Sequence, residues 1–356
     1  MFDFSLLCSL PRPKWSSFFC VLIFCGLTGV YWLAHETLIP QEIEGGALLD
    51  FLRDTRGNNP KQPQILVGGS SENGHGFHIE ELERRTGMSA AKIMLDGGRP
   101  INSLYVLECY PNETRHASML MLDLAPTMTA RPSEYDDVRR KYFNRLRGVE
   151  SFNIFTDFPP RSSVRNLLRF YGAQLRAYRR MQTNSYHFYE KRGWEGLHVP
   201  EMHKQSLRQQ AKLVRENREK LLPGDQLPIV KHKITDKCIE DVNQILDLCR
   251  SRKIFVVVVV IPQWYGQLNF TQADLNNPTE DPYLSFLQEV NERPDCTVII
   301  CRDFEEITSE GTDEDYLMDY GHLTRKGAIL YTNWLVDRLL EEPKTAELIR
   351  QCQSTP

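Results

Sequence analysis

The chain has 356 residues, enough for one large domain or two modest ones with a real core. Its hydrophobic content of 41%, charged content of 25% and aromatic content of 10% are ordinary for a globular protein. These values exclude wholesale disorder, a collagen-like repeat, a small disulfide scaffold and a membrane protein with many spans. With 43 Lys and Arg against 47 Asp and Glu, the net charge of −4 gives no sign of nucleic-acid binding.

An uncharged and strongly apolar segment lies near the N-terminus, from Trp15 to His35. Its length matches the roughly 20 residues that a helix needs to cross a bilayer. Arg12 and Lys14 precede it and acidic residues follow it, so the positive-inside rule places the first residues in the cytoplasm. The sequence predicts a cytoplasmic tail (1–14), a transmembrane anchor (15–35) and a main domain outside the cytoplasm. A cleaved signal peptide and a buried soluble helix are the alternatives.

Residues 36–60 are predicted to form a stalk, and residues 61–345 the main domain, with a mainly helical insertion at 131–235. Short apolar runs predict strands, and stretches of helical character separate them. The runs are Gln64–Val67, Lys92–Leu95, Ser118–Leu124, Ile254–Ile261 and Thr297–Cys301. Continuous rather than alternating apolar runs indicate burial on both faces, which predicts an α/β fold with a parallel sheet between helices. The basic residues of the insertion indicate solvated helix faces or a surface for acidic glycans or anionic headgroups.

The first candidate motif, Gly68-Gly69-Ser70-Ser71, follows the first predicted strand. Glycines allow a sharp turn, and a serine just beyond them lies at the strand end, where parallel sheets bind ligands. The alternative is a turn that only links strand to helix. His75 and His78, which follow, are predicted to face solvent.

The second candidate motif, Asp319-Tyr320-Gly321-His322, directly precedes the last clear helix (328–340). A serine hydroxyl needs a base to accept its proton, and histidine suits that task near neutral pH. A carboxylate three residues earlier can hold the other ring nitrogen, which fixes the tautomer. The alternative is a surface turn with an incidental histidine. The presence of both motifs at strand or helix ends of one α/β domain favours a Ser-His-Asp site.

These motifs resemble the SGNH (GDSL-like) hydrolase superfamily, specifically its membrane-anchored, extracytoplasmic branch, over roughly residues 61–340. The resemblance implies a three-layer, flavodoxin-like domain. It also implies that Ser71 is the nucleophile, His322 the base and Asp319 the residue that orients the base. Ser70 is the alternative nucleophile, because the turn also fits a GDSL pattern.

The same resemblance implies an oxyanion hole formed by the backbone N–H groups of Ser71 and Gly97, with Gly98 as the alternative to Gly97. The asparagine that the family carries after its third strand is absent here. Loss of one such donor costs about 10²–10³-fold in rate. Trp264 and Tyr265, just past the fourth predicted strand, are candidates for stacking on a sugar, with loop packing as the alternative.

The sequence therefore predicts a membrane-anchored serine esterase that cleaves acyl esters outside the cytoplasm. Its partners would be an acylated small molecule or a cell-surface glycan, with no nucleic acid and no metal or organic cofactor. One alternative is an O-acyltransferase that passes the acyl group to a cell-surface polysaccharide. Another is a non-catalytic binding or assembly module that keeps the fold.

Overall fold

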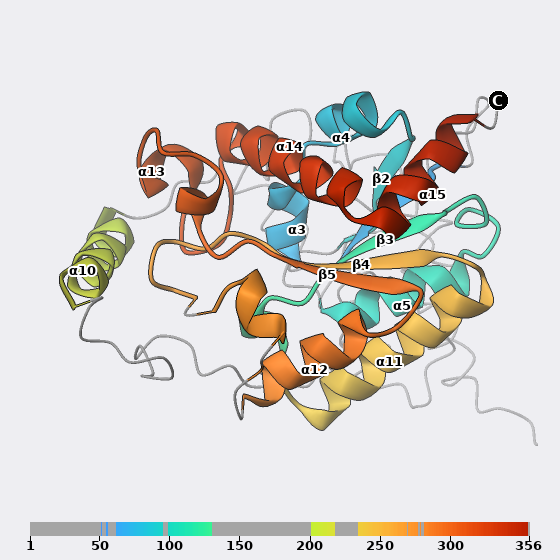
Figure 1. The fold of residues 1–356 in the computed structure, drawn as a ribbon, viewed down its shortest axis with the longest axis horizontal. Coiled ribbons are helices and arrows are strands. Elements are labelled where there is room, and N and C mark those ends of the chain that lie inside the picture. The colour runs from blue at the N-terminus through green and yellow to red at the C-terminus, as the bar shows by residue number, and fades with distance from the viewer. Residues whose placement is uncertain are drawn as a thin grey trace, which may run out of the picture.

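The computed structural model describes residues 51, 55, 62–94, 99–129, 201–217, 234–268, 270–276, 278 and 281–354. The predicted tail and anchor, and most of the predicted stalk and insertion, lie outside these residues. Within the described ranges, no helix combines the length and apolar character that a bilayer crossing requires. Five strands form one all-parallel sheet in the order β2-β1-β3-β4-β5 (Figure 1). The strands are β1 (Ile65–Gly68), β2 (Ala90–Lys92), β3 (Met119–Asp123), β4 (Phe255–Val260) and β5 (Cys296–Ile300).

The predicted α/β class with a parallel sheet is confirmed, and all five predicted strands overlap observed ones, the second at Lys92 alone. The second strand, however, was predicted at Lys92–Leu95 and lies earlier, at Ala90–Lys92. Its backbone pairs with β1 from Ile65↔Ala90 onward. The N–H of Ala90 also donates to a carboxylate oxygen of Glu83 at 2.8 Å. At this edge of the sheet, therefore, backbone pairing with β1 decides where the strand lies, and intrinsic strand preference does not.

Helices cover both faces of the sheet (Figure 1). One face carries α5 (Pro100–Cys109), α11 (Asp236–Ser251) and α12 (Pro282–Asn291). The other carries α3 (Ser71–Gly76), α4 (Ile79–Thr86), α14 (Arg325–Glu341) and α15 (Pro343–Ser354). The remaining elements are α6 (Pro126–Thr129), α10 (Glu201–Asn217), η2 (Gln272–Asn276), η3 (Phe304–Glu306) and α13 (Asp313–Tyr316).

The hydrophobic core has two parts, one on each face of the sheet. Successive residues of β3 alternate between them: Leu120 and Leu122 pack toward α5 and α11, whereas Met119 and Met121 pack toward α4 and α14. All four side chains are fully buried. Burial on both faces explains why this strand is a continuous apolar run rather than an alternating one.

A short loop, residues 318–322, connects α13 to α14 and is called the histidine loop below. An antiparallel bridge between Leu317 and Leu323 closes it at its base. The N–H of Met318 donates to the carbonyl oxygen of His322 at 2.8 Å, and both leucines are fully buried. The backbone of the loop is therefore fixed at both ends.

Gly327, in the first turn of α14, lies directly against the backbone of Tyr316. A Cβ added at Gly327 would lie 2.2 Å from the carbonyl oxygen of Tyr316. Because that oxygen belongs to the backbone leading into the histidine loop, it can yield only if the helix and the loop move apart. We expect Gly327→Ala to lower the free energy of unfolding by about 3 kcal/mol, measured by urea denaturation. Arg325→Ala, an exposed change in the same turn, should leave it nearly unchanged, and equal stability of both variants would contradict this prediction.

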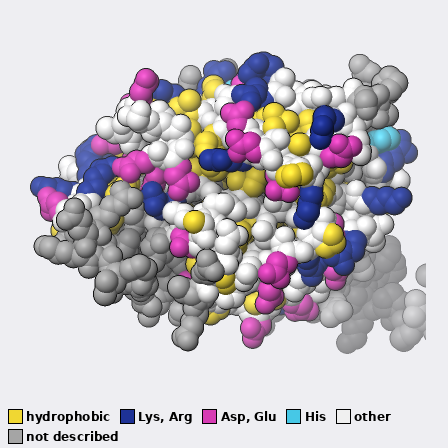
Figure 2. Space-filling model, viewed as in Figure 1, with side chains coloured by type: hydrophobic (Ala, Val, Ile, Leu, Met, Phe, Trp, Pro, Cys, Tyr) yellow, Lys and Arg dark blue, Asp and Glu magenta, His cyan; other side chains and the backbone are white. Residues whose placement is uncertain are grey.

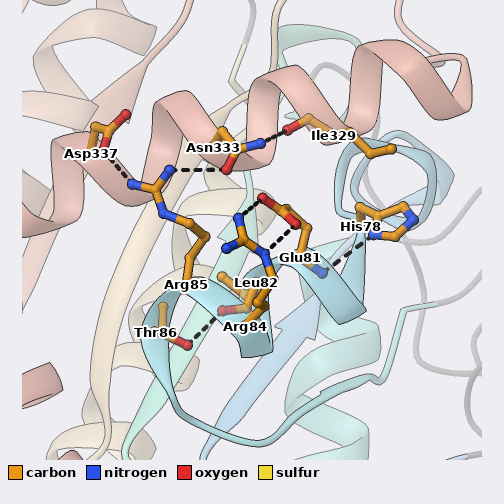
Figure 3. Close-up of polar contacts among 9 residues, drawn as sticks. All are labelled: His78, Glu81, Leu82, Arg84, Arg85, Thr86, Ile329, Asn333 and Asp337. Carbon is orange, nitrogen blue, oxygen red and sulfur yellow. Dashed lines mark hydrogen bonds and ion pairs between the residues drawn. The ribbon is translucent and has the colours of Figure 1, made fainter.

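Polar contacts join α4 to α14 within the layer of helices that also contains α3 and α15 (Figure 3). Arg85 donates to the side-chain oxygen of Asn333 at 3.0 Å and forms an ion pair with Asp337. At the other end of α4, the N–H of His78 donates to Thr332 Oγ1 at 3.0 Å. These contacts fix α14, and with it the histidine loop that precedes it, relative to the helix that follows α3.

Helix α10 is a described part of the predicted basic insertion, and it confirms a helix there. Arg208 pairs with Glu314 at 2.5 Å, and Arg215 with Glu305 at 3.6 Å. Figure 2 shows basic and acidic side chains side by side at the end of the molecule that holds α10. These exposed pairs contribute little stability. They do mean that the two arginines face acidic groups of the same domain.

Candidate active site

The serine turn, residues 68–71, leads from β1 into α3. Gly69 has a φ of +105°, in the left-handed region that favours glycine, and a Cβ there would lie 2.8 Å from the Cβ of Asp123. The N–H of Gly69 donates to Ser103 Oγ at 3.0 Å, so α5 also holds the turn. The sharp bend presents the next two residues at the carboxyl end of the central strands.

The two serines of this turn have different surroundings. Ser70 is 1% exposed; its hydroxyl donates to Asp123 and accepts from the N–H of Glu72 at 3.1 Å, which makes it the N-cap of α3. Ser71, the first residue of α3, is partly exposed, and its Oγ lies 2.9 Å from His322 Nε2. Of the two hydroxyls, therefore, the one that faces the histidine belongs to Ser71.

The histidine loop brings its carboxylate onto the far side of the imidazole ring. Nδ1 of His322 lies 2.9 and 2.8 Å from the two carboxylate oxygens of Asp319. One of these oxygens also accepts from the backbone N–H groups of Gly321 and His322, at 3.0 and 2.9 Å. Burial alone would raise the pKa of Asp319, but these hydrogen bonds and the nearby imidazole hold the pKa below its ordinary value.

This geometry fixes the protonation state that a base needs. Because an ionised carboxylate can only accept, Nδ1 of His322 carries the proton and the lone pair of Nε2 points at the Ser71 hydroxyl. The side chains of His322 and Asp319 are 17% and 20% exposed, so the site is open to solvent. The arrangement can take up the serine proton as the hydroxyl attacks an electrophile.

The third strand ends on a carboxylate, Asp123, and sequence reasoning missed its role in the site. Asp123 is 1% exposed; it accepts from the Ser70 hydroxyl and, at 2.8 Å, from the N–H of Ala125. Burial raises its pKa. A polar residue at the end of an otherwise apolar strand was the signal in the sequence. Gly97 and Gly98, the predicted oxyanion donors, lie outside the described residues.

Trp264 and Tyr265 pack against their surroundings, with exposures of 2% and 4%. The N–H of Trp264 donates to the carbonyl oxygen of Tyr320 at 2.8 Å, and the guanidinium of Arg215 lies 4.3 Å from the ring centre of Tyr265. Stacking of either ring on a sugar would require this loop to open. The burial agrees with the alternative that these rings pack the loop.

His75 is buried against the site, so the prediction that it faces solvent is wrong. It is 1% exposed, and its ring lies edge-on to that of His322, with 5.2 Å between ring centres and 88° between ring planes. The glycines on either side explain this. A Cβ on Gly74 would lie 1.8 Å from Met94 Cε, and one on Gly76 would lie 2.7 Å from Ile261 Cδ1, so α3 packs very close to its neighbours. His78 is only half-buried and caps α4.

Burial is the main cause that lowers the pKa of His75 from 6.5 to about 3; the nearby His322 and Lys92 contribute to this shift, and Asp319 opposes it. The folded protein keeps this ring neutral, whereas the unfolded chain can bind a proton there. A lower pH therefore favours the unfolded chain. The free energy of unfolding therefore has its full value above about pH 6.5. As the pH falls toward about 3, it decreases by roughly 5 kcal/mol in total because of this residue. We expect urea unfolding between pH 7 and pH 4 to show a steeper loss for the wild type than for His75→Phe. Equal slopes would contradict the buried neutral state.

The described residues contain no group of three or more His, Cys, Asp or Glu side chains that could hold a metal ion. A comparison with protein-family models found no match, and a comparison with curated proteins found none either. The resemblance to SGNH hydrolases therefore depends on the motifs around Ser71 and His322 and on the geometry described above.

Proposed function

We propose that the chain is an SGNH-like serine esterase, anchored in a membrane by residues 15–35, that cleaves acyl esters outside the cytoplasm. The contact between Ser71 Oγ and His322 Nε2, 2.9 Å long and joining residues 251 positions apart, carries this proposal. Polar residues that met by chance would not be expected to place a serine at the start of a helix against a histidine whose other ring nitrogen is bound by a carboxylate. The parallel sheet with helices on both faces is consistent with the flavodoxin-like domain of that family.

In the proposed reaction, Ser71 Oγ attacks the ester carbonyl while His322 Nε2 takes up the hydroxyl proton. The tetrahedral intermediate collapses to an acyl-serine, and His322 returns the proton to the departing alkoxide. Water then attacks the acyl-serine, gives its proton to His322, and releases the carboxylic acid; the proton returns to Ser71. Asp319 holds the ring in one tautomer and stabilises the imidazolium in each step.

The oxyanion would be held by the N–H groups of Ser71 and Gly97. The Ser71 N–H lies at the first turn of α3, where the helix offers no carbonyl four residues earlier. The residue that ends the third strand, Asp123, accepts from the Ser70 hydroxyl on one oxygen and from the N–H of Ala125 on the other, so its side chain is already engaged within the protein. With no asparagine as a third donor, we expect turnover about 10²–10³-fold below that of a site with all three.

The experiment follows acyl release from p-nitrophenyl acetate by the full chain in detergent, with and without an added cell-surface oligosaccharide. Release in buffer alone supports hydrolysis. Release that needs the oligosaccharide, with acetate transferred to it, supports the O-acyltransferase instead. A folded protein that releases nothing in either condition overturns both and leaves the binding module.

A further inference from the structure

Gln263, three residues after β4, lies between the two parts of the candidate site, which are α3 with Ser71 and the histidine loop with His322. Its side chain is 3% exposed. Its amide nitrogen lies 3.3 Å from a carboxylate oxygen of Glu72, the residue next to Ser71, and 3.3 Å from the carbonyl oxygen of Ile261. Both partners are acceptors, so the amide nitrogen belongs on this side and the amide oxygen on the other.

The other side of the amide meets the histidine loop at Gly321. A Cβ added to Gly321 would lie 2.6 Å from Gln263 Oε1 and 2.9 Å from Nε2. The backbone of Gly321 therefore rests directly on the amide group. Any larger residue at 321, or any movement of the loop toward α3, would collide with Gln263.

Backbone hydrogen bonds hold Gln263 itself in place. Its N–H donates to the carbonyl oxygen of Arg302 at 3.1 Å. The next residue, Trp264, donates to the carbonyl oxygen of Tyr320 at 2.8 Å, which is inside the histidine loop. The amide thus sits on a rigid support, with the serine helix on one side and the histidine loop on the other.

We propose that Gln263 is a positioning residue that sets the distance between Ser71 and His322, by bracing Glu72 against Gly321. This inference rests on the proposed function and adds a residue to it that touches neither substrate nor the reacting atoms. Its importance follows from the sensitivity of catalysis to geometry, since a misplacement of about 1 Å can cost about 10²-fold in rate. A carboxylate at 263 would repel Glu72 and push the two parts apart.

The test is a swap of the two side chains, read as the rate at which a fluorophosphonate labels the full chain in detergent. Gln263→Glu places two carboxylates together, and we expect labelling to slow by about 10–100-fold. Glu72→Gln combined with Gln263→Glu restores an amide–carboxylate pair in reverse and should recover most of the rate. Gln267→Glu, in the same loop but facing Gln210 of α10, is the matched control and should label at the wild-type rate.

Melting temperature and the NMR signal of the His322 Nδ1 proton are measured on the same variants. A purely structural role would lower the melting temperature of Gln263→Glu and leave the labelling rate of folded protein unchanged, which would overturn the inference. So would a swap variant that labels as slowly as Gln263→Glu. If the wild type does not label at all, the proposed function fails. The inference then still predicts that the proton signal weakens in Gln263→Glu and returns in the swap, and an unchanged signal would overturn it.

Discussion

Replacing Ser71 by alanine should abolish ester cleavage, with a fall in kcat on the order of 10⁶-fold. The reason is that, in the proposed mechanism, the hydroxyl oxygen 2.9 Å from His322 Nε2 forms the covalent bond with the acyl group. Since Ser71 is the first residue of α3, with its side chain partly exposed, alanine there should leave the fold intact. The measurement is steady-state hydrolysis of an activated ester, with circular dichroism to show that the variant is folded.

Ser70→Ala is the matched control for that change, because it removes a hydroxyl one residue away. It takes away the cap of α3, at about 1 kcal/mol, and leaves a buried acceptor on Asp123 without that donor, at about 1–3 kcal/mol. We expect a less stable protein that still cleaves esters. An inactive Ser70→Ala beside an active Ser71→Ala would show that the nucleophile had been assigned to the wrong serine.

Asp319→Asn should lower kcat by about 10⁴-fold without unfolding the protein. The amide oxygen can still accept from the N–H groups of Gly321 and His322, so the loop keeps its shape. The amide nitrogen, however, would face Nδ1 of His322 and favour the tautomer with its proton on Nε2. That tautomer cannot accept a proton from Ser71. Asp315→Asn, an exposed change in α13, serves as the control, and a loss below about tenfold at Asp319 would contradict the proposed role.

The strands that the sequence predicts correctly are those whose composition alone requires burial. β4 is a run of five valines after Phe255, and no other secondary structure suits such a run as well as a strand buried on both faces. β2 was misplaced because it has no such run: its strand character comes from pairing with β1, which is a property of the folded chain. Intrinsic preference is a weak guide at a sheet edge.

The two candidate motifs are local in sequence, and that is why their residues could be predicted. Asp319 and His322 share one loop, and Ser71 directly follows a glycine turn. His75 was missed although Gly74 and Gly76 flank it. Two glycines around one residue of a helix indicate close packing, and that signal points to a buried ring rather than an exposed one.

The supporting contacts could not be predicted, because they join residues far apart in the chain. Ser70 meets Asp123 across 53 positions, and Glu72 meets Gln263 across 191. In the sequence, no motif or spacing links the members of these two pairs. Residues of these polar types usually lie exposed at the protein surface. Only the folded structure shows that these four are buried.

The most direct test of the account is to incubate the full chain in detergent with a fluorophosphonate and to map the adduct by mass spectrometry of its peptides. We predict a single phosphonylated residue, Ser71, and no adduct once His322 is changed to alanine. An adduct on another residue, or an unmodified Ser71 in folded protein, would contradict the claim that this serine and this histidine form a nucleophile and its base.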